Sequence, residues 1–136
     1  MGEKETVINL IEEHIKRSDQ SLRSAQILLD ENLFDDSISR SYYAVYHLIR
    51  AILFSIGEES KTHKGQLNSL YLHFVKTNKI DKSLHKRIAS LFNLRGDADY
   101  GTISLFDEND AKEAYTIAED VKSVILRLIK EFINKG

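Results

Sequence analysis

The stretch SRSYYAVYHLIRAILF, residues 39–54, places two different sets of side chains on one predicted helix. Apolar residues recur every three or four positions and form one broad face, which comprises Ile38, Tyr42, Val45, Ile49, Ile52 and Ile56. The opposite side is not the plain charged surface that solvent favours, since it carries Arg40, Tyr43, Ala44, His47, Ala51 and Phe54. Alanine allows another backbone to approach closely, and aromatic residues and arginine are enriched at interfaces. We therefore expect this second face to be covered by the rest of the domain, to form the seam of a homodimer, or to line a functional groove.

The same periodicity on either side of this stretch predicts a protein built from helices. Apolar spacings of three and four indicate helices at about 4–31, 33–56, 63–77, 81–96 and 108–133. Thr62, Asp81 and the pair Asp107 and Asp110 stand where N-terminal caps are expected. The chain has no proline and no sustained alternation of apolar and polar residues. We therefore predict an all-α, up-and-down bundle of about five helices that forms one domain over residues 1–136.

The octapeptide LRGDADYG, residues 94–101, puts a permanent charge on an apolar stripe. Arg95 continues the series formed by Leu84, Ile88 and Leu91. A guanidinium that faces a core must have a partner, because an unpaired buried charge is strongly unfavourable. Asp97, Asp99 and Tyr100 offer two carboxylates and a hydroxyl within a few residues. Two interpretations stay open: a salt-bridge cluster that supports the fold, or a polar pocket that presents Arg95 to a phosphate.

Composition and charge narrow the classes of function. The net charge of the 136 residues is −2, yet the window 60–95 holds eight basic residues and one acid, Asp81. Such a window marks either a face that binds polyanions or ordinary surface lysines that pair with acids brought near by the fold. The absence of cysteine excludes thiolate zinc sites, thiol nucleophiles and disulfides. No apolar run approaches the roughly 20 residues of a membrane span, and the first residues do not resemble a signal peptide, so we expect a cytoplasmic protein.

The five histidines do not predict a metal site. No two of them are spaced at i, i+4, and there is no His-Glu-x-x-His sequence. The chain also lacks a glycine-rich phosphate loop of the Walker or Rossmann type. We therefore expect neither a bound metal nor a cofactor.

Three motifs together resemble the small stand-alone prokaryotic branch of the HEPN superfamily, whose members are of toxin/antitoxin-like type. The motifs are SRSYYAVYHLIRAIL, KTHKG and LFNLRGDADYG, followed by a long alanine-rich final helix. The resemblance covers roughly residues 20–133. It implies a helical bundle that forms a homodimer, cleavage of RNA, and a partner of the minimal nucleotidyltransferase class that acts as antitoxin.

The resemblance also implies which residues form the site, with one departure. Arg95 stands at the arginine of the family signature, but the histidine expected four to six residues later is missing. His47 or Asp99 can supply the base instead, and His47 follows Arg40 by seven residues on one helical face. The other candidate binding residues are Arg40, Tyr43, His63, Lys64, Asp97 and Tyr100. Three hypotheses follow: a metal-independent ribonuclease, a non-catalytic module that binds RNA or nucleotide, and an interaction protein in which the Arg95–Asp99 cluster is structural.

Overall fold

The computed structural model describes residues 2–100 and 106–135, and for residues 97–100 it describes the backbone alone. Over these residues the chain forms five α-helices and one short π-helix, and no strand. The helices are α1 (Glu3–Asp30), α2 (Phe34–Phe54), α3 (His63–Leu70), α4 (Lys82–Tyr100) and α5 (Glu108–Asn134), with the π-helix η1 (Tyr71–Val75) directly after α3. The prediction of an all-α bundle of about five helices is confirmed.

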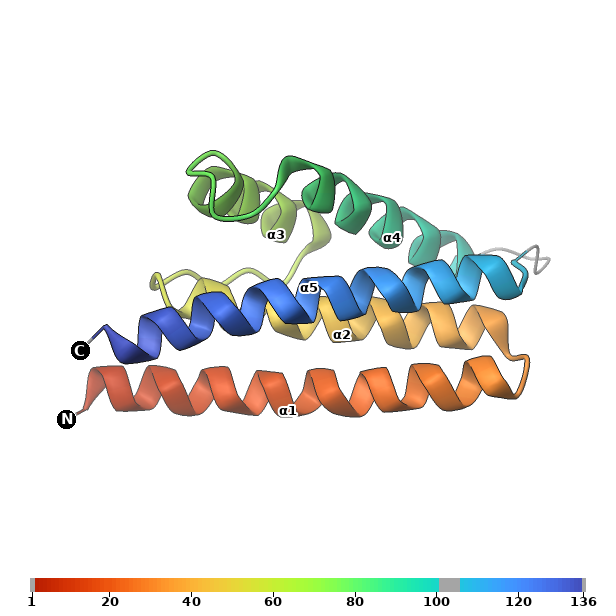
Figure 1. The fold of residues 1–136 in the computed structure, drawn as a ribbon, viewed down its shortest axis with the longest axis horizontal. Coiled ribbons are helices and arrows are strands. Elements are labelled where there is room, and N and C mark those ends of the chain that lie inside the picture. The colour runs from red at the N-terminus through yellow and green to blue at the C-terminus, as the bar shows by residue number, and fades with distance from the viewer. Residues whose placement is uncertain (1, 101–105, 136) are drawn as a thin grey trace.

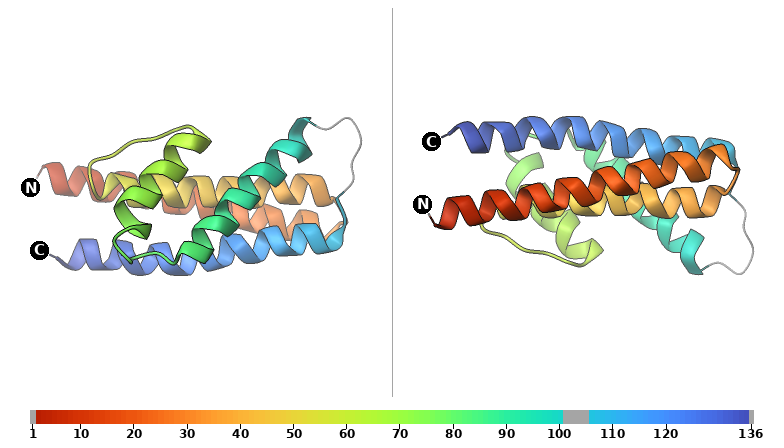
Figure 2. Two further views of the ribbon diagram at one scale, coloured as in Figure 1. Left: turned by 90° about the horizontal axis from the view of Figure 1, so that it is seen from above. Right: turned by 90° about the horizontal axis from the view of Figure 1, so that it is seen from below.

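The helices form two layers with α2 in the middle. The three long helices α1, α2 and α5 lie side by side, and α3 and α4 cover the other side of α2 (Figure 1). Seen from above and below, α4 crosses the long helices obliquely (Figure 2). Because α2 touches α1, α3, α4 and α5, about half of its residues are buried, including Val45, Leu48 and Ile49.

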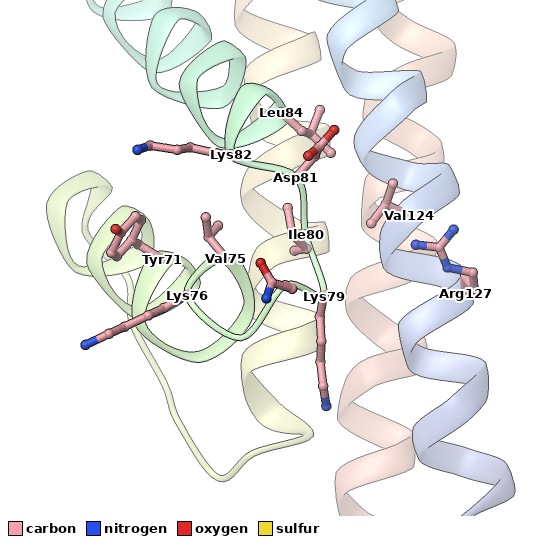
Figure 3. A pocket seen from close by; sticks show the side chains of 11 residues that line it. Tyr71, Val75, Lys76, Lys79, Ile80, Asp81, Lys82, Leu84, Val124 and Arg127 are labelled. Atoms are coloured by element: carbon pink, nitrogen blue, oxygen red, sulfur yellow. The ribbon is translucent and has the colours of Figure 1, made fainter.

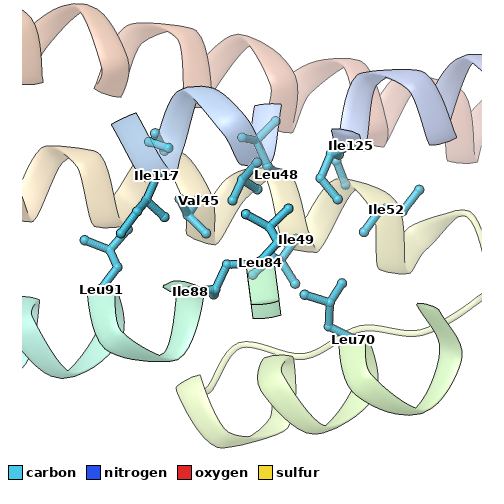
Figure 4. Packing of buried hydrophobic residues seen from close by; sticks show 14 of the residues in the cluster. Val45, Leu48, Ile49, Ile52, Leu70, Leu84, Ile88, Leu91, Ile117 and Ile125 are labelled. Atoms are coloured by element: carbon cyan, nitrogen blue, oxygen red, sulfur yellow. The ribbon is translucent and has the colours of Figure 1, made fainter. Parts of the chain in front are cut away.

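The core lies between α2, α4 and α5, with α3 closing one end. Ile49 of α2, Ile88 of α4 and Ile125 of α5 are almost completely buried, and Leu70 of α3 packs beside them (Figure 4). Fully burying one such side chain contributes about 1.5–3 kcal/mol relative to leaving it exposed. The apolar stripe of α4 that the spacing predicted is therefore the face that packs on α2.

The second face of α2 is partly covered from within the chain. Ala44 and Ala51 have no exposed surface, and the Ser18 hydroxyl of α1 donates a hydrogen bond of 2.9 Å to the Ala44 carbonyl oxygen. The two small side chains let α1 approach the α2 backbone closely. Of the three alternatives for this face, coverage by the rest of the domain therefore holds at Ala44 and Ala51, because the chain's own first helix packs there.

Two element boundaries differ from the sequence-based prediction. The fourth helix does not end at Arg95 and Gly96 but continues to Tyr100, since a single glycine costs only about 1 kcal/mol in a helix interior. The segment predicted at 63–77 is an α-helix that changes to a π-helix at Tyr71. The caps at Thr62 and Asp107 are confirmed: the Thr62 hydroxyl accepts a hydrogen bond from the Gly65 amide, and Asp107 forms a capping box with Asp110.

Candidate functional site

Arg95 lies against two tyrosines of the central helix. The periodicity of α4 turns Arg95 toward α2, where its guanidinium carbon is 4.7 Å from the ring centroid of Tyr42 and 5.3 Å from that of Tyr43. An Nη nitrogen of Arg95 donates a hydrogen bond of 2.9 Å to the Tyr43 hydroxyl oxygen. The aromatic faces attract the cation and the hydroxyl group orients it. The guanidinium group of Arg95 thus packs against aromatic rings, which the sequence pattern did not predict.

A second arginine approaches the same tyrosine. The guanidinium carbon of Arg40, one turn before Tyr43 on α2, is 4.7 Å from the centroid of the Tyr43 ring. Arg40 and Arg95 therefore share one aromatic ring, although their like charges repel each other. An anion that bound between them would relieve this repulsion.

His63 completes this group from the start of α3. Its ring centroid is 4.9 Å from that of Tyr42 and 5.0 Å from that of Phe92, a neighbour of Arg95 on α4. Burial, and next the positive charge of Arg95, lower the pKa of His63 below its ordinary value. The imidazole is consequently neutral at pH 7 and has a nitrogen free of a proton. We name the set the Arg95 cluster: Arg40, Tyr42, Tyr43, His63, Phe92 and Arg95.

The remaining predicted residues on the Arg95 side are described only in part. Asp97, Asp99 and Tyr100 belong to the last turns of α4, but their side chains lie outside the described residues. The pairing of Arg95 with an aspartate therefore stays a prediction. Lys64 follows His63 on α3 and is exposed.

His47 belongs to a different contact. Its Nδ1 atom is 3.0 Å from Nδ1 of His14 on α1, and the two rings stack with centroids 5.2 Å apart. Burial, and next the charges of His14, Arg17 and Arg50, lower the pKa of His47 to about 4. None of the described contacts of His47 is with Arg40 or Arg95, so the structure does not bring together the Arg–His pair suggested by the spacing of seven.

Sequence reasoning missed three aromatic participants. Tyr42 and Phe92 are buried, and the apolar spacing predicted this burial for Tyr42. The spacing did not predict that the Tyr42 ring contacts Arg95 or that the Phe92 ring contacts His63. His14 was not singled out at all. The adjacent tyrosines of the SRSYYAVYH motif were the available signal for these contacts. Neighbouring residues on a helix point in different directions, so both rings cannot belong to the centre of one apolar face.

The basic window is divided by the fold. Arg87 pairs with Asp120 at 2.8 Å and Lys61 approaches Glu59 at 3.9 Å, as expected for ordinary surface pairs. The other lysines of the window form no ion pair with a described residue; they are Lys64, Lys76, Lys79, Lys82 and Lys86. The interpretation as ordinary surface pairs therefore holds for Arg87 and Lys61, and the binding of polyanions by the other lysines stays a prediction.

The described residues offer neither a cluster of metal ligands nor a membrane-spanning helix. They contain no group of three or more histidine, cysteine, aspartate or glutamate side chains arranged to hold a metal ion. None of the helices within residues 2–100 and 106–135 combines the length and the apolar character needed to span a membrane.

Comparisons with known proteins agree on the family. A UPF0332 protein of Thermotoga maritima is 32% identical over 131 residues, which cover 96% of this chain and 97% of that protein. "Putative toxin MJ0605" of Methanocaldococcus jannaschii is 30% identical over 116 residues, which cover 85% of this chain and 84% of that protein.

A solved structure shares the fold. The crystal structure of TT1696 from Thermus thermophilus matches with a TM-score of 0.75 at 14% identity, covering 87% of this chain and 97% of that one. The HEPN domain model matches residues 11–129, a range that includes the central helix α2 and all residues of the Arg95 cluster. Because this family model matches most of its residues, the chain belongs to the HEPN domain family.

Proposed function

We propose that the protein is a toxin-type enzyme that cleaves RNA at the Arg95 cluster. The observation that carries the proposal is the meeting of Arg40, Arg95 and the neutral His63 around one pair of tyrosines. Cleavage of RNA by its own 2′-hydroxyl needs a cation for the phosphate and a base for the hydroxyl proton. The kinship with proteins named as putative toxins supports the same class of activity.

The chemistry assigns one role to each side chain. Arg95 and Arg40 hold the non-bridging oxygens of the scissile phosphate, and His63 accepts the proton of the 2′-hydroxyl. The 2′-oxygen then attacks phosphorus, the bond from phosphorus to the 5′-oxygen breaks, and that oxygen takes a proton from water. The products are a 2′,3′-cyclic phosphate and a 5′-hydroxyl. Because the Tyr43 oxygen accepts from Arg95, the Tyr43 proton is available to a phosphate oxygen.

Cleavage of a single-stranded RNA tests this proposal. We expect Arg95→Ala and His63→Ala to lower the rate about 100-fold or more, which is the usual loss for a phosphate-binding cation or a general base. His73→Ala is the matched control, since His73 pairs with Glu58 outside the cluster. Native rates in both cluster variants would overturn the proposal, and RNA binding without cleavage by the native protein would establish the non-catalytic binding module instead.

The pH profile distinguishes a base from a residue that merely supports the fold. A lowered pKa keeps His63 in its proton-accepting form below pH 6.5, so activity should persist there and fall only at more acidic pH. Asp99→Asn, on the last turn of α4, shows whether that carboxylate contributes the base. If Asp99→Asn abolishes the acidic limb while His63→Ala retains it, the base is Asp99.

We further propose that the protein acts in the cytoplasm as a homodimer with an antitoxin of the minimal nucleotidyltransferase class. Relatives named as putative toxins support an antitoxin partner. Expression of the chain alone should arrest growth, and co-expression of such a nucleotidyltransferase should restore it. Arg95→Ala should be harmless without the partner, whereas an equally toxic Arg95→Ala variant would separate toxicity from the cluster.

Light scattering at tens of micromolar tests the dimer, and a monomer would contradict it.

A further inference from the structure

A hollow of the described surface lies away from the Arg95 cluster. It has a volume of about 690 Å³ and lies between η1, the segment that follows it, the start of α4 and the middle of α5 (Figure 3). None of the residues that line it belongs to the Arg95 cluster. We name it the basic groove after its four cationic residues: Lys76, Lys79, Lys82 and Arg127.

The charges of the basic groove are not balanced by the fold. Asp81 is the one acid in its lining, and none of the four cations forms an ion pair with a described residue. Cations elsewhere on the surface do find acids, as Lys112 does with Glu108 and Lys122 with Asp19. Four like charges around a concave surface create a positive potential that attracts anions from solution.

The backbone of the groove is firmly held. The π-helix is closed by the hydrogen bond from the Lys76 amide to the Tyr71 carbonyl oxygen, and π-turns occur frequently at functional sites. The amides of Lys79 and Ile80 both donate to the Phe74 carbonyl oxygen, at 2.8 and 2.9 Å, and Asn78 takes a left-handed conformation with φ of 64°. Ile80 is only 3% exposed and anchors the segment to the core. The backbone positions of the lysines are therefore fixed by the fold, and their side chains are exposed to solvent.

The arrangement of the cations selects the shape of the ligand. The Lys76 and Lys82 side chains extend away from α5, Lys79 extends in another direction, and Arg127 lies across from them on α5 (Figure 3). Because the ammonium groups do not converge on one point, a single phosphate group cannot engage all of them. A chain of several phosphate groups can, since each cation then meets its own negative charge.

We propose that the basic groove is a binding site for a chain of phosphate groups, supplied either by a free polyphosphate tail or by the backbone of a single-stranded RNA. The proposal goes beyond the function assigned to the Arg95 cluster and does not depend on it. Arg127 and the three lysines would bind phosphate oxygens. The apolar side chains of Ile80 and Leu84 offer no hydrogen-bonding group to a base, so the site would not distinguish one RNA sequence from another.

Calorimetric titration at low salt tests the proposal with three probes: orthophosphate, tripolyphosphate and a short single-stranded RNA. We expect tripolyphosphate to bind more than 10-fold tighter than orthophosphate. The double variant Lys79→Gln/Arg127→Gln should weaken tripolyphosphate binding at least 10-fold. The double variant Lys16→Gln/Lys130→Gln, which removes two exposed lysines outside the groove, is the matched control and should bind like the native protein.

The probes also identify the source of the phosphates. Parallel loss of RNA affinity in Lys79→Gln/Arg127→Gln assigns the groove to the RNA backbone, whereas loss of tripolyphosphate affinity alone assigns it to a free polyphosphate. The groove contribution is the part of the affinity that Lys79→Gln/Arg127→Gln removes, whereas any binding at the Arg95 cluster is the part that Arg95→Ala removes, so failure of the catalytic proposal does not affect this result. Equal binding by the native protein and the groove variant, or no binding of either polyanion, would overturn the proposal.

Discussion

The ring of Tyr43 contacts two guanidinium groups, and its hydroxyl group accepts a hydrogen bond from one of them. Arg40 and Arg95 both lie within 5.3 Å of the ring centroid, and the hydroxyl oxygen accepts a hydrogen bond from Arg95. A hydrogen bond from a charged donor contributes more than one between neutral groups. Tyr43 is therefore the residue that orients Arg95, the group that we propose holds a phosphate.

Tyr43→Phe isolates the contribution of the hydroxyl group. The ring remains for both arginines, but Arg95 loses its acceptor, so we expect the free energy of unfolding to fall by about 1–2 kcal/mol. Urea unfolding measures the change. Tyr115→Phe is the control, because the Tyr115 hydroxyl makes only an exposed contact of 3.4 Å with Gln26 and should cost less than about 0.5 kcal/mol. Equal losses in the two variants would mean that the Tyr43 hydroxyl does not hold Arg95.

The His14–His47 pair is a second feature at the residue scale. With the Nδ1 atoms 3.0 Å apart, one ring must donate and the other accept, so the contact requires at least one neutral imidazole. Burial is the leading cause that lowers the pKa of both histidines. The pair joins α1 to α2, and its double protonation would place two N–H donors face to face.

Acid should destabilise the protein through this pair. Both pKa values are lower in the folded protein, so the folded state binds fewer protons than the unfolded chain. The stability of the neutral pair is thus complete above about pH 6.5 and is lost as the pH falls toward about 4, the folded pKa of His47. After allowance for partial exposure we expect a loss on the order of 2 kcal/mol. In His47→Gln this part of the pH dependence of unfolding should disappear, and an unchanged slope would contradict the assignment.

At the scale of the elements, α2 is an internal helix rather than a surface one. Its apolar face packs on α4 and α5, and its alanine positions pack on α1. The part of its second face that carries Arg40 and Tyr43 stays half-buried beside α3 and α4. One helix therefore supplies both the centre of the core and the aromatic wall of the candidate site.

Ala51→Glu distinguishes this packing from a seam between two copies. A glutamate at a position without exposed surface leaves an unpaired charge between α1 and α2, so we expect a loss of at least about 3 kcal/mol of stability. Thermal unfolding followed by circular dichroism measures the loss. Gln20→Glu, at an exposed position of α1, should change stability by less than about 0.5 kcal/mol. A stable, folded monomer of Ala51→Glu, obtained where the native protein is a dimer, would restore the seam.

At the scale of the whole molecule, an acidic chain carries its positive charge in separate places. The net charge is −2, while cations gather at the Arg95 cluster with Lys64 and at the basic groove. Arg87 and Lys61 are instead neutralised by their acidic neighbours. RNA, which we propose as the ligand, should therefore meet these separate groups of cations through a limited number of phosphate contacts.

The salt dependence of the RNA affinity measures the number of these phosphate contacts. Each phosphate contact on a single strand contributes about −0.7 to the log–log slope of affinity against salt, so four contacts give roughly −3. Charge reversal of Lys64, Lys82 and Lys86 together should remove most of the binding, whereas reversal of the exposed Lys16, Lys130 and Lys135 should have little effect. Fluorescence anisotropy with a labelled RNA measures both. Binding that survives the first triple change would show these lysines to be ordinary surface residues.

The sequence by itself determined the helices and the family. Spacings of three and four predicted each of the described α-helices, because each buries one continuous stripe, and the caps at Thr62 and Asp107 marked two of the starts. Local pattern also identified Arg95 as a charge that needs partners. These features depend on neighbours along the chain, which a sequence displays directly.

Only the tertiary structure decided what meets at Arg95 and what covers α2. Tyr43 is 52 residues from Arg95, and His14 is 33 residues from His47, so no local pattern connects either pair. The alanines of α2 permit close approach by any helix, and the fold selected α1 from the same chain. The extension of α4 past Gly96 likewise lay beyond local propensity. The physical reason is the same in each case: side chains distant in sequence compete for the same surface, and packing of the whole bundle determines which of them occupies it.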